Sequence, residues 1–150
     1  MHANEESSLS TRADASGDAL DDYRSSHATT GAVTDYIRTY EAGYYGALWR
    51  RIERPLVEAT LRELGGPQRR CLDFACGTGR ITAVAADHFA EVVGVDVSAL
   101  MLASGHHANN VRLQQIDITQ QSLGDTFDVV TAFRFFLNAE QRLRREALVS

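Results

Sequence analysis

A loop of small residues between an apolar run and a helical pattern constrains this chain more than any other feature. Residues 71–80 read CLDFACGTGR, so an apolar run reaches the carboxylate of Asp73, passes two glycines and enters a helical pattern. Gly77 and Gly79 let the backbone turn tightly and approach a ligand without a Cβ in the way. The helix that follows begins with unpaired N–H groups. The segment therefore predicts a strand that passes to a helix around a nucleotide-like ligand.

A second acid stands at a matching position in the next strand. Asp96 closes the apolar run EVVGVDV, seventeen residues beyond Gly79. Apolar residues on both faces of this run are typical of a buried strand in a parallel sheet. Two acids at the ends of neighbouring strands, on either side of a glycine loop, indicate a nucleoside site.

Length, composition and charge limit the class of protein. A chain of 150 residues, 44% of them hydrophobic, is expected to form one domain with a sizeable core. The net charge is -5, of which -4 falls within residues 1–30, and no basic run follows. We therefore expect no nucleic-acid partner. No apolar run reaches the roughly 20 residues of a membrane span, so we expect no membrane partner and a cytoplasmic location.

The chain divides into three regions. Residues 1–30 are polar and acidic and are expected to form a disordered leader. Residues 31–66 are expected to form N-terminal helices, with Pro55 breaking or kinking the run and Gly65 ending it. Their large apolar side chains recur at every fourth position: Tyr36, Tyr40, Tyr44, Leu48 and Ile52. This spacing fits a lid over a ligand, or a helix face packed on the sheet.

Residues 67–150 alternate between strand and helix patterns. The expected strands are 70–74, 91–97, 111–116 and 127–133, and the expected helices are 80–89, 98–107 and 138–149. Such alternation predicts an α/β fold, a doubly wound Rossmann-like parallel sheet. A sheet of this kind normally continues beyond four strands. The domain is therefore expected to be incomplete, truncated after the fourth strand.

Four segments in series resemble the motifs of class I S-adenosylmethionine-dependent methyltransferases. They read DFACGTGR, VVGVDVSALML, QQIDI and FDVVTAF, and together they cover roughly residues 68–138. The resemblance implies a class I methyltransferase fold and S-adenosyl-L-methionine as cofactor. It also implies methyl transfer, which we expect to act on a small-molecule acceptor.

The resemblance assigns cofactor contacts to positions around the strand ends. Asp73 would receive the amino group of the methionine part, Asp96 the two ribose hydroxyls and Asp117 the adenine amino group. The implied cofactor-binding set is Asp73, Ala75, Cys76, Gly77, Thr78, Gly79, Asp96, Val97, Met101, Asp117 and Ile118. Family members usually have glycine at Ala75. Strand-end aspartates also cap helices and bind loop amides, which is the structural alternative for each acid.

Acceptor contacts are expected after the fourth strand, at Arg134, Phe135 and Asn138. Arg134 fits an acidic acceptor, the cofactor carboxylate or a structural ion pair equally well. The sequence gives no assignment of catalytic residues, of the acceptor or of the oligomeric state. His106 and His107 are expected at a helix end on the surface.

Two other functions are compatible with parts of this pattern. An NAD-dependent oxidoreductase would have glycine at the third position of G-x-G-x-x-G, where this chain has Thr82. The second alternative is a cofactor-binding fragment without catalysis, because the missing strands help to form an acceptor pocket. Cys71 and Cys76 lack neighbours at metal spacing, so no metal is expected.

Overall fold

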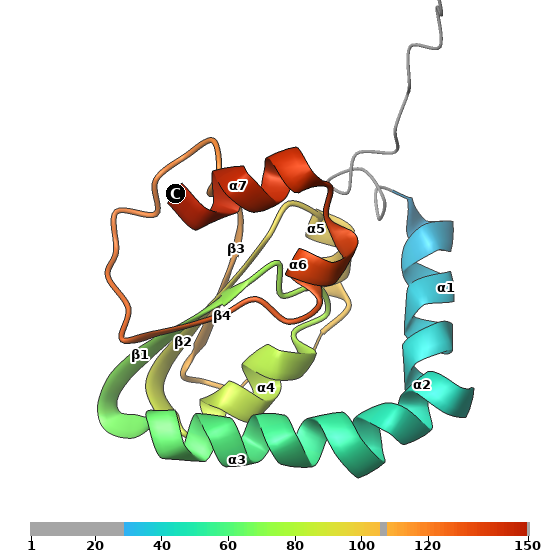
Figure 1. Ribbon diagram of the computed structural model, residues 1–150, viewed down its shortest axis with the longest axis horizontal. Coiled ribbons are helices and arrows are strands. Elements are labelled where there is room, and N and C mark those ends of the chain that lie inside the picture. The colour runs from blue at the N-terminus through green and yellow to red at the C-terminus, as the bar shows by residue number, and fades with distance from the viewer. Residues whose placement is uncertain (1–28, 106–107, 150) are drawn as a thin grey trace, which may run out of the picture.

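A four-stranded parallel sheet organises the computed structural model, which describes residues 29–105 and 108–149 (Figure 1). Its strands are β1 (Gly66–Phe74), β2 (Phe89–Asp96), β3 (Val111–Gln115) and β4 (Val129–Thr131). They lie in the order β3-β2-β1-β4, so the winding reverses between β1 and β4. This order confirms the expected doubly wound parallel sheet. The predicted leader falls almost entirely outside the described residues, and His106 and His107 lie outside them too.

One face of the sheet is covered by α3 (Arg54–Leu64) and α4 (Arg80–Ala86). Cys71 of β1 stands beside Val92 of β2 and Val129 of β4, and all three side chains contribute to this core. Leu61 of α3 belongs to the same core and is only 2% exposed. The side chains alternate in direction along each strand, so their neighbours in sequence face the other way.

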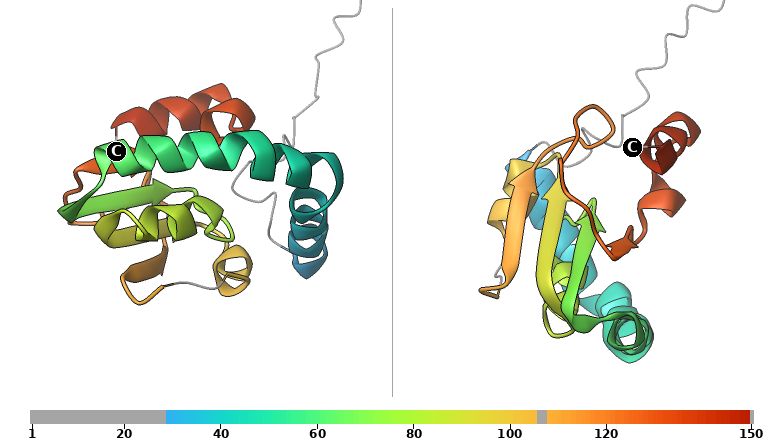
Figure 2. Two further views of the ribbon diagram at one scale, coloured as in Figure 1. Left: turned by 90° about the horizontal axis from the view of Figure 1, so that it is seen from below. Right: turned by 90° about the vertical axis from the view of Figure 1, so that its left-hand side faces the viewer.

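The opposite face is covered by a loop and by two short helices. Leu72, Val93 and Val95 form its centre, and residues 116–127 pack on them without forming a helix. Phe74 connects this cluster to α6 (Phe135–Asn138) and α7 (Gln141–Val149). A single helix over 138–149 was expected. Extended backbone at Ala139 separates two helices instead. The left-hand view of Figure 2 places α7 and β3 at opposite ends of the molecule.

The N-terminal helices turn at a different residue from the one predicted. α1 (Thr30–Glu41) ends at an extended Ala42, and Gly43 follows with a φ of 59°. From there α2 (Gly43–Leu48), a π-helical turn η2 (Trp49–Glu53) and α3 run on as one long helix (Figure 1). The expected break at Pro55 is therefore wrong. Proline is tolerated in the first turn of a helix, and here the wider π turn immediately precedes it.

The helix after β2 begins as its sequence predicts. The Ser98 hydroxyl accepts from the Met101 N–H at 3.3 Å and caps α5 (Ala99–Ala103). α5 packs against β2 and β3 and also touches α1. Within the described part of the chain, no helix is long and apolar enough to cross a membrane. The division into N-terminal helices and a sheet domain at residue 67 remains a prediction.

Candidate cofactor site

A cavity of about 300 Å³ opens at the carboxyl ends of β1 and β2. It lies beside the point where the winding of the sheet reverses, which is where open α/β sheets bind their ligands. Most of the predicted cofactor-binding residues line it. We call the part around Asp96, Asp117 and Met101 the nucleoside end, and the part around Tyr36, Tyr40, Arg80 and Arg134 the arginine end.

The glycine loop forms the floor of the cavity. Gly77 and Gly79 have φ angles of 58° and 79°, in the left-handed region that favours glycine. A Cβ on Gly77 would lie 3.0 Å from the Met101 Cε. Ala75 also has a positive φ, 53°, and it packs against the cluster of Phe135 and Leu143. The methyl group at this unusual alanine therefore contacts the core of α6 and α7.

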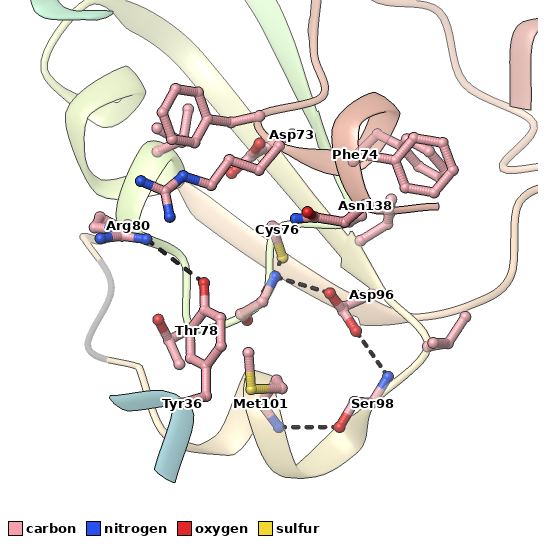
Figure 3. A pocket seen from close by; sticks show the side chains of 18 of the residues that line it. Tyr36, Asp73, Phe74, Cys76, Thr78, Arg80, Asp96, Ser98, Met101 and Asn138 are labelled. Carbon is pink, nitrogen blue, oxygen red and sulfur yellow. Dashed lines mark hydrogen bonds between the residues drawn. The ribbon is translucent and has the colours of Figure 1, made fainter. Parts of the chain in front are cut away.

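Asp96 holds the loop in place through two backbone amides. Its Oδ2 accepts from the Gly77 N–H and its Oδ1 from the Ser98 N–H, each at 2.8 Å (Figure 3). Each carboxylate oxygen has a second lone pair, so the group can also accept from a vicinal diol. The carboxylate thus fixes the glycine loop and the start of α5 while it lines the cavity.

Asp73 is tied to two threonine hydroxyls. The side chain is 1% exposed, and it accepts from the Thr82 hydroxyl at 2.6 Å and the Thr131 hydroxyl at 2.8 Å. Burial raises the pKa of Asp73 to about 6, although these hydrogen bonds oppose the rise. The carboxyl group therefore joins β1, α4 and β4 beneath the glycine loop. Its contact with a ligand amino group remains a prediction.

The third predicted acid lies on the wall of the nucleoside end. Asp117 Oδ1 accepts from the Thr119 hydroxyl at 2.6 Å and from the Thr119 N–H at 3.0 Å. Val97 and Ile116 line the same wall. Ile118 does not, because its side chain packs into the sheet core around Leu72 and Val93. The geometry disagrees with the expected cofactor contact of Ile118, and it offers Ile116 instead.

The arginine end contains Arg80, which the sequence did not identify as a site residue, among aromatic side chains. The Arg80 guanidinium lies 4.7 Å from the Trp49 ring centre and 5.4 Å from that of Tyr40. Its Nη2 is 3.5 Å from the Tyr36 hydroxyl (Figure 3). Burial raises the pKa of Tyr36, so its hydroxyl stays protonated at neutral pH. The signal in the sequence that could have identified Arg80 as a site residue is its position directly after the glycine loop.

The three acceptor candidates have different surroundings. Arg134 lines the cavity and forms an ion pair with Glu53 at 2.7 Å. Phe135 is 2% exposed and stacks edge-on against Phe74, with ring centres 4.5 Å apart. Asn138 is exposed and also borders the cavity. In this structure Arg134 has the structural ion pair that was one of its three alternatives, and Asn138 is the most open to an acceptor.

The two cysteines are unsuited to nucleophilic chemistry. Burial raises the pKa of Cys71 to about 12 and also raises the pKa of Cys76. Both thiols therefore remain protonated at neutral pH, and a thiol is a far weaker nucleophile than a thiolate. Among the described residues, no three His, Cys, Asp or Glu side chains come together as a metal site.

The fold and the cavity at the strand ends define a doubly wound α/β protein, and comparison with known proteins specifies the family. The model of the methyltransferase domain family matches residues 71–149. The chain therefore belongs to the methyltransferase domain family, which confirms the resemblance to class I S-adenosylmethionine-dependent methyltransferases.

Individual relatives agree with this assignment. A probable S-adenosylmethionine-dependent methyltransferase of Saccharomyces cerevisiae, CRG1, is 30% identical over 80 residues, which are 53% of this chain and 28% of the yeast protein. The structure of CalS10, an amino pentose methyltransferase from Micromonospora echinaspora, is 29% identical with a TM-score of 0.55. That match covers 71% of this chain and 49% of CalS10.

A further solved structure supports the fold. A TehB-like methyltransferase from Corynebacterium glutamicum has a TM-score of 0.58 at 21% identity, covering 80% of this chain and 65% of that one. In each of these comparisons the chain spans less than two thirds of its relative.

Proposed function

We propose that the protein binds S-adenosylmethionine in the cavity and serves methyl transfer to a small-molecule acceptor. The observation that carries this proposal is the position of Asp96. Its carboxylate stands at the tip of β2, holds the Gly77 amide and faces the cavity at the point where the winding reverses. A carboxylate in this place suits the two hydroxyls of a ribose.

The charges along the cavity fit the two ends of the cofactor. Asp96 and Asp117 supply acceptor oxygens at the nucleoside end, where ribose and adenine present hydroxyl and amino donors. Arg80 and Tyr36 supply donors at the arginine end, where the amino-acid part presents a carboxylate. Opposite charges at the two ends would fix the direction in which the cofactor lies.

The methyl group is already activated when the cofactor is bound, because S-adenosylmethionine presents it on a positively charged sulfur. The protein has to align an acceptor atom with that methyl group and exclude water. A general base is needed only where the acceptor must lose a proton. An aromatic wall of Tyr36, Tyr40 and Phe133 borders the cavity and fits the exclusion of water.

The small-molecule acceptor is supported by the relatives. CalS10 is an amino pentose methyltransferase, and KedS8 from a Streptoalloteichus species is a sugar N-methyltransferase that is 27% identical with a TM-score of 0.51. The segment Arg134-Phe135-Phe136-Leu137 also differs from the Asp/Asn-Pro-Pro-aromatic motif of methylases that act on amino groups of nucleic acids or glutamine.

Calorimetric titration with S-adenosylmethionine, its demethylated product S-adenosylhomocysteine and NADH tests the proposal. We expect both sulfur nucleosides to bind and NADH not to bind. Binding of NADH alone would support the oxidoreductase alternative and overturn the proposal. Binding of S-adenosylmethionine without methyl transfer to any of a panel of amino sugars and phenols would favour the non-catalytic alternative.

A further inference from the structure

We propose that Arg134 is a positioning residue that builds the arginine end of the cavity. Through its ion pair with Glu53 it holds the N-terminal helices against the end of β4. It thereby increases the contribution of the amino-acid part of the cofactor to the binding affinity, and it leaves the contribution of the nucleoside part unchanged. This inference rests on the function proposed above, because that function places an amino-acid group at the arginine end.

The ion pair is short, bifurcated and largely shielded from solvent. Arg134 Nη2 donates to both carboxylate oxygens of Glu53, at 2.7 and 2.9 Å. The two side chains are only 17% and 20% exposed. Exposed ion pairs contribute little to stability. Removing one partner of a shielded pair is destabilising, because it leaves the other charge uncompensated. The pair therefore joins the last residue of η2 to the residue before α6.

Aromatic rings surround the same guanidinium. Its Cζ lies 4.8 Å from the Tyr40 ring centre, 5.6 Å from that of Phe133 and 5.9 Å from that of Tyr45. A guanidinium over the face of an aromatic ring is attracted by the electrons of the ring. Two of these rings come from α1 and α2, so Arg134 contacts the N-terminal helices through their aromatic side chains as well as through Glu53.

Tyr40 carries this contact on to the cavity. Its ring centre lies 4.5 Å from that of Tyr36, and its ring also faces Arg80 at 5.4 Å. Tyr36 in turn contacts Arg80 through its hydroxyl. A Tyr40 released by loss of Arg134 would therefore no longer hold the two side chains that would receive the amino-acid part.

The backbone of Arg134 is in an unusual conformation for a residue with a Cβ. Its φ and ψ are 64° and -8°, in the left-handed region. Such a conformation is unfavourable outside glycine, and it persists where the surroundings impose it, commonly at functional sites. Here it occurs at the residue whose guanidinium is bound by Glu53.

The nucleoside end does not depend on this pair. Asp96 is held by the amides of Gly77 and Ser98, and Asp117 by Thr119, and none of these hydrogen bonds involves a residue of the N-terminal helices. Loss of the ion pair between Glu53 and Arg134 should therefore lower the affinity only of ligands that place a group at the arginine end. S-adenosylhomocysteine carries the amino-acid part, and 5′-methylthioadenosine lacks it.

The experiment measures the affinity of both compounds by calorimetry for the wild type, R134Q, E53Q and the exchanged pair E53R/R134E. R38Q is the matched control, because it removes an arginine from an ion pair on α1 whose side chains are 78% and 67% exposed. We expect R134Q and E53Q to lose about tenfold in affinity for S-adenosylhomocysteine, within the range of coupling effects. The affinity for 5′-methylthioadenosine and the R38Q control should stay within about twofold of the wild type. The exchanged pair restores the ion pair but not the contacts of the guanidinium with the rings, so it should recover only part of the loss.

Trp49 provides a second measurement that needs no ligand. It is the single tryptophan of the chain, and it lies 6.1 Å from the Phe133 ring and under Arg80. Its fluorescence should shift to the red in R134Q and return part of the way in the exchanged pair. If the wild type bound neither compound, the proposed function would fail, and the fluorescence would still test the positioning role.

Three results would overturn the inference. One is equal weakening of both compounds in R134Q, which would indicate a general structural role. Another is an unchanged affinity together with an unchanged Trp49 spectrum. The third is loss of the cooperative thermal transition in R134Q and E53Q alike, since the pair would then be a requirement for folding.

Discussion

The two ends of the cavity are built in different ways. At the nucleoside end, Asp96 is bonded to amides two and nineteen residues away, and the glycine loop runs directly from β1 into α4. At the arginine end, Arg80 contacts a tyrosine 44 residues away, and Arg134 contacts a glutamate 81 residues away. The nucleoside end is therefore formed mostly by backbone groups at the edge of the sheet. The arginine end is formed by side chains that come together from separate segments.

This difference implies a different sensitivity to mutation. A strand tip and a tight loop have few alternative conformations, so one lost anchor or one added methyl group disturbs the whole nucleoside end. Long side chains that meet across helices can re-pack around a vacancy. We therefore expect large effects at the nucleoside end and graded effects at the arginine end.

The largest effect is expected for D96A, which would break the nucleoside end. The variant loses the acceptor for two ribose hydroxyls, each charge-assisted bond contributing about 2 kcal/mol, so affinity for S-adenosylhomocysteine should fall about a thousandfold. Calorimetric titration measures the loss. D87A, which removes an exposed acid at the end of α4, is the control and should bind normally. Binding of S-adenosylhomocysteine by D96A with the affinity of the wild type would contradict the proposal that Asp96 binds the ribose.

The buried acid below the loop should give the next largest effect, as a pH dependence of stability. Because the pKa of Asp73 is raised from 3.8 to about 6, the folded protein keeps a proton between these values that the unfolded chain has released. Stability is therefore lost as the pH rises through this window, by roughly 3 kcal/mol between about pH 4 and pH 7. Asparagine at position 73 does not titrate.

Urea unfolding of the wild type and D73N across this pH range measures the effect. The unfolding free energy of the wild type minus that of D73N should fall as the pH rises. A difference that stays constant with pH would show that the Asp73 pKa is not raised in the folded protein.

The third effect concerns the close packing under the glycine loop. A Cβ on Gly94 of β2 would lie 2.7 Å from Leu113 Cδ2, 3.1 Å from Cys76 Sγ and 3.2 Å from Thr82 Oγ1. We expect G94A to lower the unfolding free energy by about 2 kcal/mol, as overpacking of a core does. G31A is the control, because nothing lies within 4 Å of its Cβ in α1. Equal stability of the two variants, measured by thermal melting, would contradict the expectation.

The smallest effect is expected at the arginine end. R80Q should weaken S-adenosylhomocysteine about tenfold, because one charged hydrogen-bonding partner of the carboxylate is lost. It should leave 5′-methylthioadenosine unchanged, and R80K should recover part of the loss. If R80Q weakened both compounds alike, Arg80 would have to act through the fold of the loop instead of through the carboxylate.

The sequence predicted the placement of the strand-end acids because its signals are local, whereas their contacts with a ligand stay a prediction. The apolar runs, the glycines and the acids at their ends specify strand, loop and strand tip in order, and the structure brings Asp73, Asp96 and Asp117 to one edge. The cavity lining differs only at Gly79, which bends the loop without lining it, and at Ile118. Ile118 lies in the turn after β3, where its side chain packs on the sheet core, and no strand periodicity predicts its direction there.

The arginine end could not be predicted in the same way. The spacing of Tyr36 and Tyr40 fits both a lid and a core face, and no local pattern indicates that Glu53 meets Arg134. The break expected at Pro55 failed for a different reason. The helix changes direction at Gly43, where φ is positive, and the π turn directly precedes the first turn of α3, which contains the proline. The meeting of Glu53 with Arg134 thus depends on segments far apart in the chain, whereas the course of the helix depends on local backbone conformation.

The π-helical turn at Trp49–Glu53 has a consequence for how this scaffold tolerates deletions. A π turn holds one more residue than the α-helical turn it replaces. The turn absorbs this extra residue, so removing a single residue there would convert the stretch into regular α-helix and leave α2 and α3 in nearly the same orientation. Removing one residue from the regular helix of α3 would instead rotate everything before it by about 100° relative to the residues after it. α1 and its tyrosines would then turn away from the sheet, so the π turn is where a one-residue deletion disturbs the cavity least.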